Sequence, residues 1–300
     1  MRVTHQMVKN TVISNIQRNL SNMERYQNML SSGKALRRPS DDPIKVARVM
    51  SYKTALSQNE QYQKNINAAK SWMETGDYAL EGITEILHRT KELAITGANG
   101  SMPQSARDAL AMEVVELTNV LVQFGNSSYE GRYIFGGYKT TEVPFVREAG
   151  EAVEYKGNEG DITWEVAPGV NIKGNFHGDE LFFLKDGSKI HSIFNIMDNL
   201  AQALKSSDNG AIDKAILDLS NATDHVLDKR ASLGATVNGL ELTLENYMSQ
   251  KINFTELCSG LEDIDFAETI MNFTVMENIY RAAIASGAQI IQPSLLDFLR

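Results

Sequence analysis

Apolar residues recur every three or four positions through most of the chain, which is the spacing of one face of an α-helix. Residues 4–31 contain neither Pro nor Gly, and their pattern predicts the first helix. The apolar seam of that helix consists of Ile13, Ile16, Leu20, Met23 and Leu30. Because an isolated helix of this kind is only marginally stable in water, we expect it to pair with another helix.

The pattern changes twice along the rest of the chain. Helical spacing first continues and predicts helices over residues 43–75, 78–96 and 104–125, with a break at Gly76 and Asp77. From residue 129 to residue 190 glycine is frequent and the hydrophobic period shortens toward two. Strands are predicted there over residues 153–156, 162–166 and 170–175.

Helical spacing then returns and predicts helices over residues 192–206, 211–257 and 262–288. Residues 211–247 keep one heptad register over five heptads, which is the strongest coiled-coil pattern in the chain. Ser259 and Glu262 have the spacing of a capping box, so the last helix is expected to begin there. Its apolar seam includes Ile264, Met271 and Val275 and becomes small and polar further on.

These elements predict a mainly α fold. The expected architecture is a long helical rod or coiled-coil bundle formed by the N- and C-terminal halves, with a small β-rich inserted domain, because non-adjacent helices must pair to bury their stripes. The expected domains are paired terminal helices at residues 1–34 and 264–300, a helical-bundle rod at 35–128 and 191–263, and a β-rich insertion at 129–190.

The break between the first two helices is strongly marked. Gly33 can adopt the left-handed conformation that ends a helix, and Pro39 and Pro43 prevent the helix from continuing through the loop. Asp42 directly precedes Pro43, so we expect Asp42 to cap the next helix and Pro43 to be its first residue. Asp41 and Asp42 also place negative charge at the positive end of the new helix dipole.

Charge and composition narrow the choice of partners. The net charge of −9 disfavours nucleic acid, and no apolar run reaches the length that a membrane span requires. Residues 1–50 carry nine Lys/Arg and three Asp/Glu, which is +6, whereas residues 251–300 carry three and seven, which is −4. Ends that meet in the fold or in an assembly would therefore attract each other. The single cysteine, Cys258, excludes an intrachain disulfide and fits either a cytoplasmic protein or one exported unfolded.

No motif in the sequence predicts catalysis. The five histidines form none of the short metal-ligand spacings, and Ser32-Gly33-Lys34 resembles the end of a P-loop without the Gly that should precede it. We interpret Cys258 as a buried or incidental thiol, and Asp263 and Asp265 as acids at a helix start. We therefore expect neither an enzyme nor a bound cofactor or metal ion.

Several separated stretches resemble one family. The stretch Leu30–Pro43, which includes Gly33, Ser40, Asp41 and Asp42, resembles the segment near the N-terminus of bacterial flagellins and flagellar hook-associated proteins. Similar stretches lie at residues 60–69, 230–241, 261–268 and 294–299. Residues 131–140 resemble the hook–filament junction members, hook-associated protein 3, more than flagellin through Gly131, Arg132, Phe135, Gly136 and Gly137.

The resemblance implies a structural, secreted flagellar protein that polymerises through its terminal helices and joins the hook to the filament. It implies homo-oligomers, flagellin on one side, another hook-associated protein on the other, and a cytoplasmic export chaperone at the C-terminal region. Export would use the flagellar type III apparatus without a cleaved signal peptide. The implied assembly interface consists of the two terminal seams together with Leu295 and Leu296. Two alternatives remain, flagellin itself and a soluble coiled-coil adaptor protein.

Overall fold

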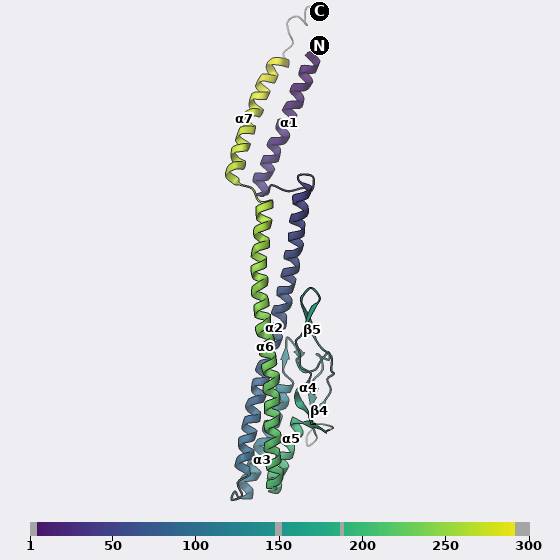
Figure 1. The fold of residues 1–300 in the computed structure, drawn as a ribbon, viewed down its shortest axis with the longest axis vertical. Helices are drawn as coiled ribbons and strands as arrows, with labels where there is room; N and C mark the ends of the chain where they lie inside the picture. The colour runs from purple at the N-terminus through teal and green to yellow at the C-terminus, as the bar shows by residue number, and fades with distance from the viewer. Residues whose placement is uncertain (1–4, 148–151, 187–188, 292–300) are drawn as a thin grey trace, which may run out of the picture. The chain divides into compact units, whose positions relative to one another are not determined.

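The computed structural model describes residues 5–147, 152–186 and 189–291, and it is mainly α-helical (Figure 1). Its helices are α1 (His5–Ser32), α2 (Pro43–Gly97), α3 (Gln104–Gly125), α4 (Gly178–Phe182), α5 (Ile193–Ser206), α6 (Asn209–Glu262) and α7 (Phe266–Ile291). The contacts divide the chain into two units. The first contains the residues up to Gln58 and from Ser249 onward, and the second contains Asn59–Met248.

In the second unit, α2 and α6 lie side by side and run in opposite directions (Figure 1). The Asn59 side-chain amide donates a hydrogen bond to the Tyr247 carbonyl at 3.1 Å, and the Lys91 ammonium donates to the Ser220 hydroxyl at 3.1 Å. Residues further along α2 therefore contact residues nearer the start of α6. The antiparallel pairing lets both helices bury their apolar stripes along the same line.

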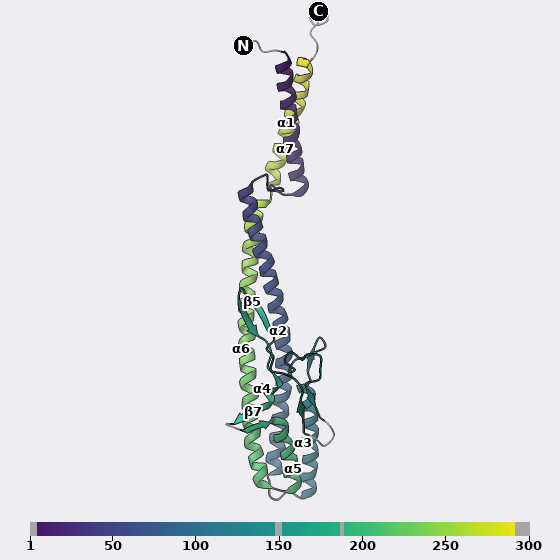
Figure 2. The same cartoon turned by 90° about the vertical axis from the view of Figure 1, so that its right-hand side faces the viewer.

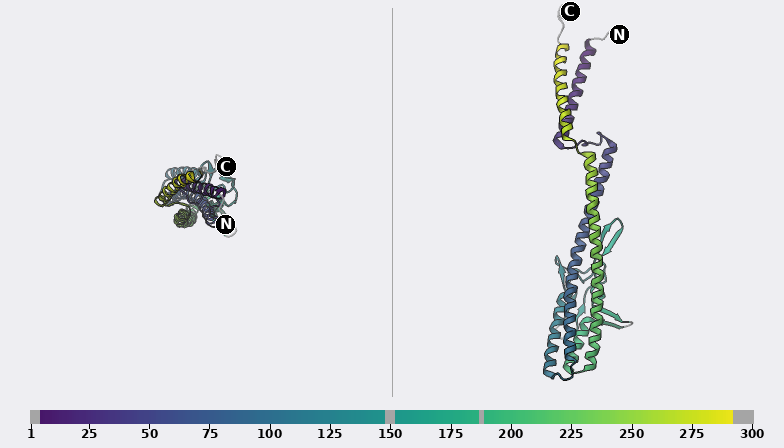
Figure 3. Two further views of the ribbon diagram at one scale, coloured as in Figure 1. Left: turned by 90° about the horizontal axis from the view of Figure 1, so that it is seen from above. Right: turned by 60° about the vertical axis from the view of Figure 1, so that its left-hand side comes forward.

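The heptad register predicted for residues 211–247 is confirmed. Every seventh residue of that part of α6 is buried, with at most 5% of its surface exposed, namely Ile212, Leu219, Val226, Leu233 and Leu240. The helices α3 and α5 lie alongside α2 and α6 (Figure 3). They join the same hydrophobic core through residues such as Leu121 and Leu200. A four-helix arrangement therefore forms the body of the second unit.

The strands form separate two-stranded antiparallel pairs among the described residues, not one continuous sheet. They are β1 (Ser128–Tyr129) with β2 (Arg132–Tyr133), β3 (Phe145–Val146) with β4 (Glu154–Tyr155), β5 (Thr163–Ala167) with β6 (Val170–Lys173), and β7 (Phe183–Asp186) with β8 (Lys189–Ser192). The three predicted strands are present with ends moved by one or two residues. The ring of Phe145 lies 4.6 Å from Phe182 on α4 and 5.3 Å from Phe194 on α5, so the β-rich segment packs its aromatic residues into the helical core.

The predicted helix break at Gly76 and Asp77 is wrong. The helix α2 continues through both residues without interruption. Gly76 is buried, with Leu233 and Ile134 close to where a side chain would project, and Asp77 pairs with Arg230 at 2.8 Å. A glycine costs about 1 kcal/mol inside a helix, which tertiary contacts of this kind readily offset.

The predicted capping box at Ser259–Glu262 is also wrong. The helix α6 runs on to Glu262, and α7 begins only at Phe266. The residue that caps α7 is Asp265, whose Oδ1 accepts hydrogen bonds from the backbone N–H groups of Ala267 at 2.8 Å and Glu268 at 3.2 Å. The interpretation of Asp265 as a helix-start acid is therefore confirmed.

Candidate assembly surface

The first and last helices of the described chain, α1 and α7, form an antiparallel pair in the first unit (Figure 2). Gly287 near the end of α7 lies against Val12 and Ile16 near the start of α1. A Cβ placed on Gly287 would come within 3.0 Å of Val12 and 3.3 Å of Ile16. At the other end of the pair, Gly33 lies next to the ring of Phe266. Gly287 thus lets the two helices approach closely.

On α1, the predicted seam is correct at three positions and displaced at two. Ile16, Met23 and Leu30 are half-buried, whereas Ile13 is 38% exposed and Leu20 is 44% exposed. Among the half-buried positions of α1, a heptad pattern connects Val12, Ile16, Asn19, Met23, Tyr26 and Leu30. Steps of three and four residues fit the predicted seam and the observed seam equally well. Because the observed seam, which faces α7, includes the polar Asn19, hydrophobic spacing favoured the other one.

On α7, two residues of the predicted seam lie outside the face that contacts α1. Met271 is 61% exposed and Val275 is 47% exposed, so they do not cover Leu20. The face with the lowest exposure contains Thr269, Phe273, Met276, Tyr280, Ala283 and Gly287. The helix α7 is apolar on two faces, and hydrophobic spacing alone does not determine which of them packs against α1. The predicted Leu295 and Leu296 lie outside the described residues.

Six apolar side chains of α7 outside the face that contacts α1 are exposed to solvent, and together we call them the outer face of α7. It consists of Phe266, Ile270, Met271, Val275, Ile279 and Ile284, each between 42% and 61% exposed. Monomeric soluble proteins rarely expose large contiguous apolar patches, and such patches mark interaction sites. The exposed Ile13 and Leu20 of α1 are further apolar residues of the same helix pair.

The loop between α1 and α2 is fixed by its own backbone and side-chain bonds. Gly33 has φ +71°, as predicted for the residue that ends α1, and its carbonyl accepts from the Ile264 backbone N–H at 3.1 Å. The Ala35 N–H donates to the Glu262 carbonyl at 2.7 Å. Ile264 is half-buried in this connection between α6 and α7. The two chain reversals, residues 33–42 and 263–265, are thereby tied together.

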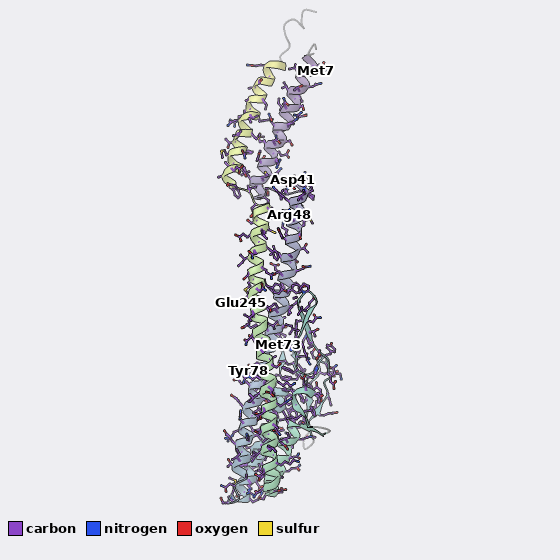
Figure 4. The ribbon with its side chains drawn as sticks, in the orientation of Figure 1. Met7, Asp41, Arg48, Met73, Tyr78 and Glu245 are labelled. Carbon is purple, nitrogen blue, oxygen red and sulfur yellow. The ribbon has the colours of Figure 1, made fainter. Side chains whose placement is uncertain are left out.

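The two acids of the loop have distinct roles. Asp41, labelled in Figure 4, accepts hydrogen bonds from the backbone N–H groups of Arg38 at 2.9 Å and Arg37 at 3.1 Å, and these bonds lower the pKa of its carboxyl. Asp42 caps α2 by accepting from the N–H groups of Ile44 and Lys45, both at 3.1 Å. The predicted cap and the predicted first residue, Pro43, are confirmed, while Ser40 is exposed in the turn.

Glu262 is a residue of this connection that sequence reasoning missed. Its side chain is only 11% exposed and lies 2.8 Å from the ammonium groups of both Lys34 and Lys53. Burial opposes ionisation, but the hydrogen bonds from the two lysines prevail and lower the pKa of the carboxyl. The bond to Glu262 also raises the pKa of Lys34. Only the opposite charges of the two chain ends hinted at such a contact.

We expect Glu262→Gln to weaken the end of α6 by about 1 kcal/mol, because two half-exposed lysines lose their carboxylate. The folded-state pKa of Glu262 is lowered, so its contribution is present above the ordinary value of 4.5 and is lost as the pH falls through the lowered value. Hydrogen exchange of residues 249–262 should therefore be faster in the variant at neutral pH and equal in acid. Glu256→Gln, an exposed change on the same helix, is the control. Equal exchange of the variant and the wild type at neutral pH would contradict this role.

The residues of the 131–140 motif build the second unit from within. Glu130 and Gly131 have φ +51° and +77° and form the tight turn between β1 and β2, after which Arg132 is exposed. Phe135 is 1% exposed, and its carbonyl accepts from the Gly178 N–H and the Tyr155 hydroxyl, both at 2.9 Å.

The two glycines that follow Phe135 permit a close chain crossing. A Cβ on Gly137, whose φ is +68°, would collide with the Asn158 carbonyl, and one on Gly136 would come within 2.6 Å of the Lys139 carbonyl. The motif therefore specifies the local fold of the second unit. It contributes no apolar surface comparable to the outer face of α7.

The described residues provide little for catalysis. No group of three His, Cys, Asp or Glu side chains among them is placed to hold a metal ion. Cys258 is buried, and burial raises the pKa of its thiol, which fits an unreactive residue. Of the helices in the described ranges, none has both the length and the hydrophobicity to cross a membrane.

Long antiparallel helix pairs, with apolar side chains left exposed on the terminal pair, are typical of a helical structural protein. The bacterial flagellin N-terminal helical region matches residues 3–140, and the bacterial flagellin C-terminal helical region matches residues 211–299. The two regions together span most of the sequence, and the chain belongs to the bacterial flagellin family.

Relatives within this family include both junction and filament proteins. Flagellar hook-associated protein 3 of Escherichia coli (strain K12) is 28% identical over 94% of this chain and 95% of that protein. Flagellin of Bacillus subtilis (strain 168) is 26% identical over the full length of both. Residue identity alone thus separates the two kinds of relative only slightly.

Solved structures share the fold. A putative flagellar hook-associated protein of Vibrio parahaemolyticus has a TM-score of 0.68, 22% identity, and covers 74% of this chain and 100% of its own. FlgL of Xanthomonas campestris has a TM-score of 0.63, 18% identity, and covers 69% of this chain and 99% of its own. The mainly α fold predicted from the sequence is the fold of these proteins.

Proposed function

We propose that this chain is the structural subunit that joins the flagellar hook to the filament, and that it polymerises through α1 and α7. The observation that carries the proposal is the outer face of α7, which stays in solvent in a single copy although its side chains are as apolar as those of the inner face. Burial of apolar surface contributes about 25 cal/mol per Å². Several such side chains covered by neighbouring copies would hold a polymer together.

Two findings favour the junction over the filament as the location of this protein. Residues 131–140 resemble the junction proteins, and curated relatives in Escherichia coli and Salmonella typhimurium are hook-associated proteins 3 at 28% and 27% identity. Flagellin is the alternative, supported by the Bacillus subtilis relative. In the proposed position, the chain contacts flagellin on one side, another hook-associated protein on the other, and further copies of itself.

Export completes the proposal. The chain would leave the cell unfolded through the flagellar export apparatus, without a cleaved signal peptide, and with a cytoplasmic chaperone on its C-terminal region. The described part of the terminal helix pair suits such a route, because no α1 side chain from residue 6 to residue 32 is fully buried. Little free energy opposes its unfolding, given a backbone ordering cost of about 1–2 kcal/mol per residue.

We therefore expect the terminal pair to be weakly protected in the isolated monomer and ordered in the assembly. Amide hydrogen exchange on the purified chain should be fast over Ile13–Leu30 and Met271–Ala288, and slow over the buried heptad residues of α6 around Leu219. The same segments should become protected in isolated flagella. Strong protection of both terminal segments in the free monomer would contradict assembly-coupled ordering.

Deletion of the gene tests the junction proposal. Cells without the protein are expected to make hooks and to release flagellin into the medium, because nothing anchors the filament. Flagellin in the supernatant and hooks on the cells are measured by immunoblot and electron microscopy, and plasmid complementation is the control. If this chain is the filament subunit instead, the deletion leaves no flagellin in the medium, and filaments of normal length would exclude both positions.

A further inference from the structure

A charged cleft lies in the first unit where α1 meets the loop that follows it. Its volume is about 280 Å³, and its charged lining residues are Glu24, Arg25, Lys34, Arg37, Arg38 and Asp41. Lys34 is already paired with Glu262. The three arginines are exposed, and none of their guanidinium groups forms an ion pair with a described residue. Asp41 lies among them, but its hydrogen bonds go to the backbone N–H groups of Arg37 and Arg38. The cleft therefore carries surplus positive charge with unused donors.

A matching surplus of negative charge lies on α6 in the second unit. Asp224 and Asp228 are exposed, four residues apart on one side of the helix, and neither forms an ion pair within the described chain. The cations beside them, Lys229 and Arg230, are already paired with carboxylates of other segments. Like charges at this spacing repel each other and destabilise a helix. Leu227, which lies between them in the sequence, is 41% exposed and adds an apolar side chain to this face.

We propose that the arginine cleft of one copy binds the Asp224–Asp228 face of a neighbouring copy of this chain. The pairing rests on the proposed assembly, in which copies meet side by side. A second copy is the occupant that the charges favour, because the chain as a whole carries −9 whereas its first fifty residues carry +6. Planar guanidinium groups hold carboxylates through paired hydrogen bonds, which fixes the orientation of one copy on the next.

The contact joins two different surfaces, so it is head-to-tail and repeats from copy to copy around a ring or along a helix. Each subunit would offer its cleft to one neighbour and its acidic face to another. The outer face of α7 would supply the apolar area of assembly, and this ionic contact would set the register.

Cross-linking in isolated flagella tests the contact. Arg38→Cys and Asp228→Cys are combined in a Cys258→Ser background, and the flagella are treated with a short bis-maleimide. A ladder of dimers and higher multimers is expected, since every copy carries both cysteines. Each single-cysteine variant should stay monomeric. Arg48→Cys, an exposed arginine on α2 outside the cleft (Figure 4), replaces Arg38→Cys in the matched control and should give no ladder.

Charge exchange provides the second measurement. Arg38→Glu and Asp228→Arg are each expected to reduce the amount of protein in isolated flagella at least tenfold, and the double variant should restore most of it, whereas Arg48→Glu should have no effect. Absence of the wild-type chain from flagella would overturn the proposed function itself. Normal incorporation without a ladder, cross-links to another protein at Arg38→Cys, or no rescue by the double variant would overturn this contact alone.

Discussion

Leu219→Asp is expected to unfold much of the second unit. Leu219 has no exposed surface in the centre of the α6 seam, so a carboxylate there would be buried without a partner. The lost packing and the desolvated charge together cost about 4 kcal/mol or more, a large share of a typical domain's 5–15 kcal/mol. Both tryptophans, Trp72 and Trp164, lie in the second unit with ring centroids 6.0 Å apart. Urea unfolding followed by tryptophan fluorescence therefore reports on this unit.

Leu217→Asp is the matched control on the same helix. Leu217 is 62% exposed two residues away, so the same chemical change should alter the unfolding free energy by about 0.5 kcal/mol or less. The comparison separates burial from any general effect of an added carboxylate on α6. Equal midpoints for Leu219→Asp and the wild type would contradict the packing of this helix.

The second large effect is expected in the assembly. Met271→Asp combined with Val275→Asp places two carboxylates on the outer face of α7, where the free chain leaves both positions in water. The monomer should keep its helix content, while incorporation into flagella should fall by two orders of magnitude or more, because burying unpaired charge between copies costs several kcal/mol. Circular dichroism of the monomer and immunoblots of sheared flagella measure the two quantities.

Asn238→Asp combined with Asn253→Asp adds the same charge to exposed polar positions of α6, away from the outer face of α7. This control should assemble as the wild type does. If the Met271 and Val275 variant assembles equally well, or if the control fails to the same degree, the outer face of α7 is not the assembly surface.

Much of the fold follows from hydrophobic spacing. The five buried heptad residues from Ile212 to Leu240, the left-handed Gly33 and the Asp42 cap all follow from local rules that tertiary contacts reinforce. The continuity of α2 through Gly76 does not follow from them, because the contacts of Gly76 with Leu233 and Ile134 come from segments far away in the sequence. Local helix preference is weak compared with such packing.

The candidate surface was predictable only in part. The terminal helices and their need for partners follow from their narrow apolar stripes. However, α7 has two apolar faces, and the face of α1 that contacts α7 includes the polar Asn19. Which face meets the partner helix depends on Gly287, whose close approach to Val12 appears only in three dimensions. Glu262 was missed for a similar reason, since Lys34 and Lys53 reach it from elsewhere in the sequence.

Immunogold labelling of isolated flagella tests the central claim most directly. An antibody against the second unit, applied to intact hook–filament assemblies and viewed by electron microscopy, should label one narrow zone where the hook meets the filament. Flagella from the deletion strain complemented with this chain should regain that zone. Gold distributed along the whole filament would contradict the junction assignment and identify the chain as a filament subunit.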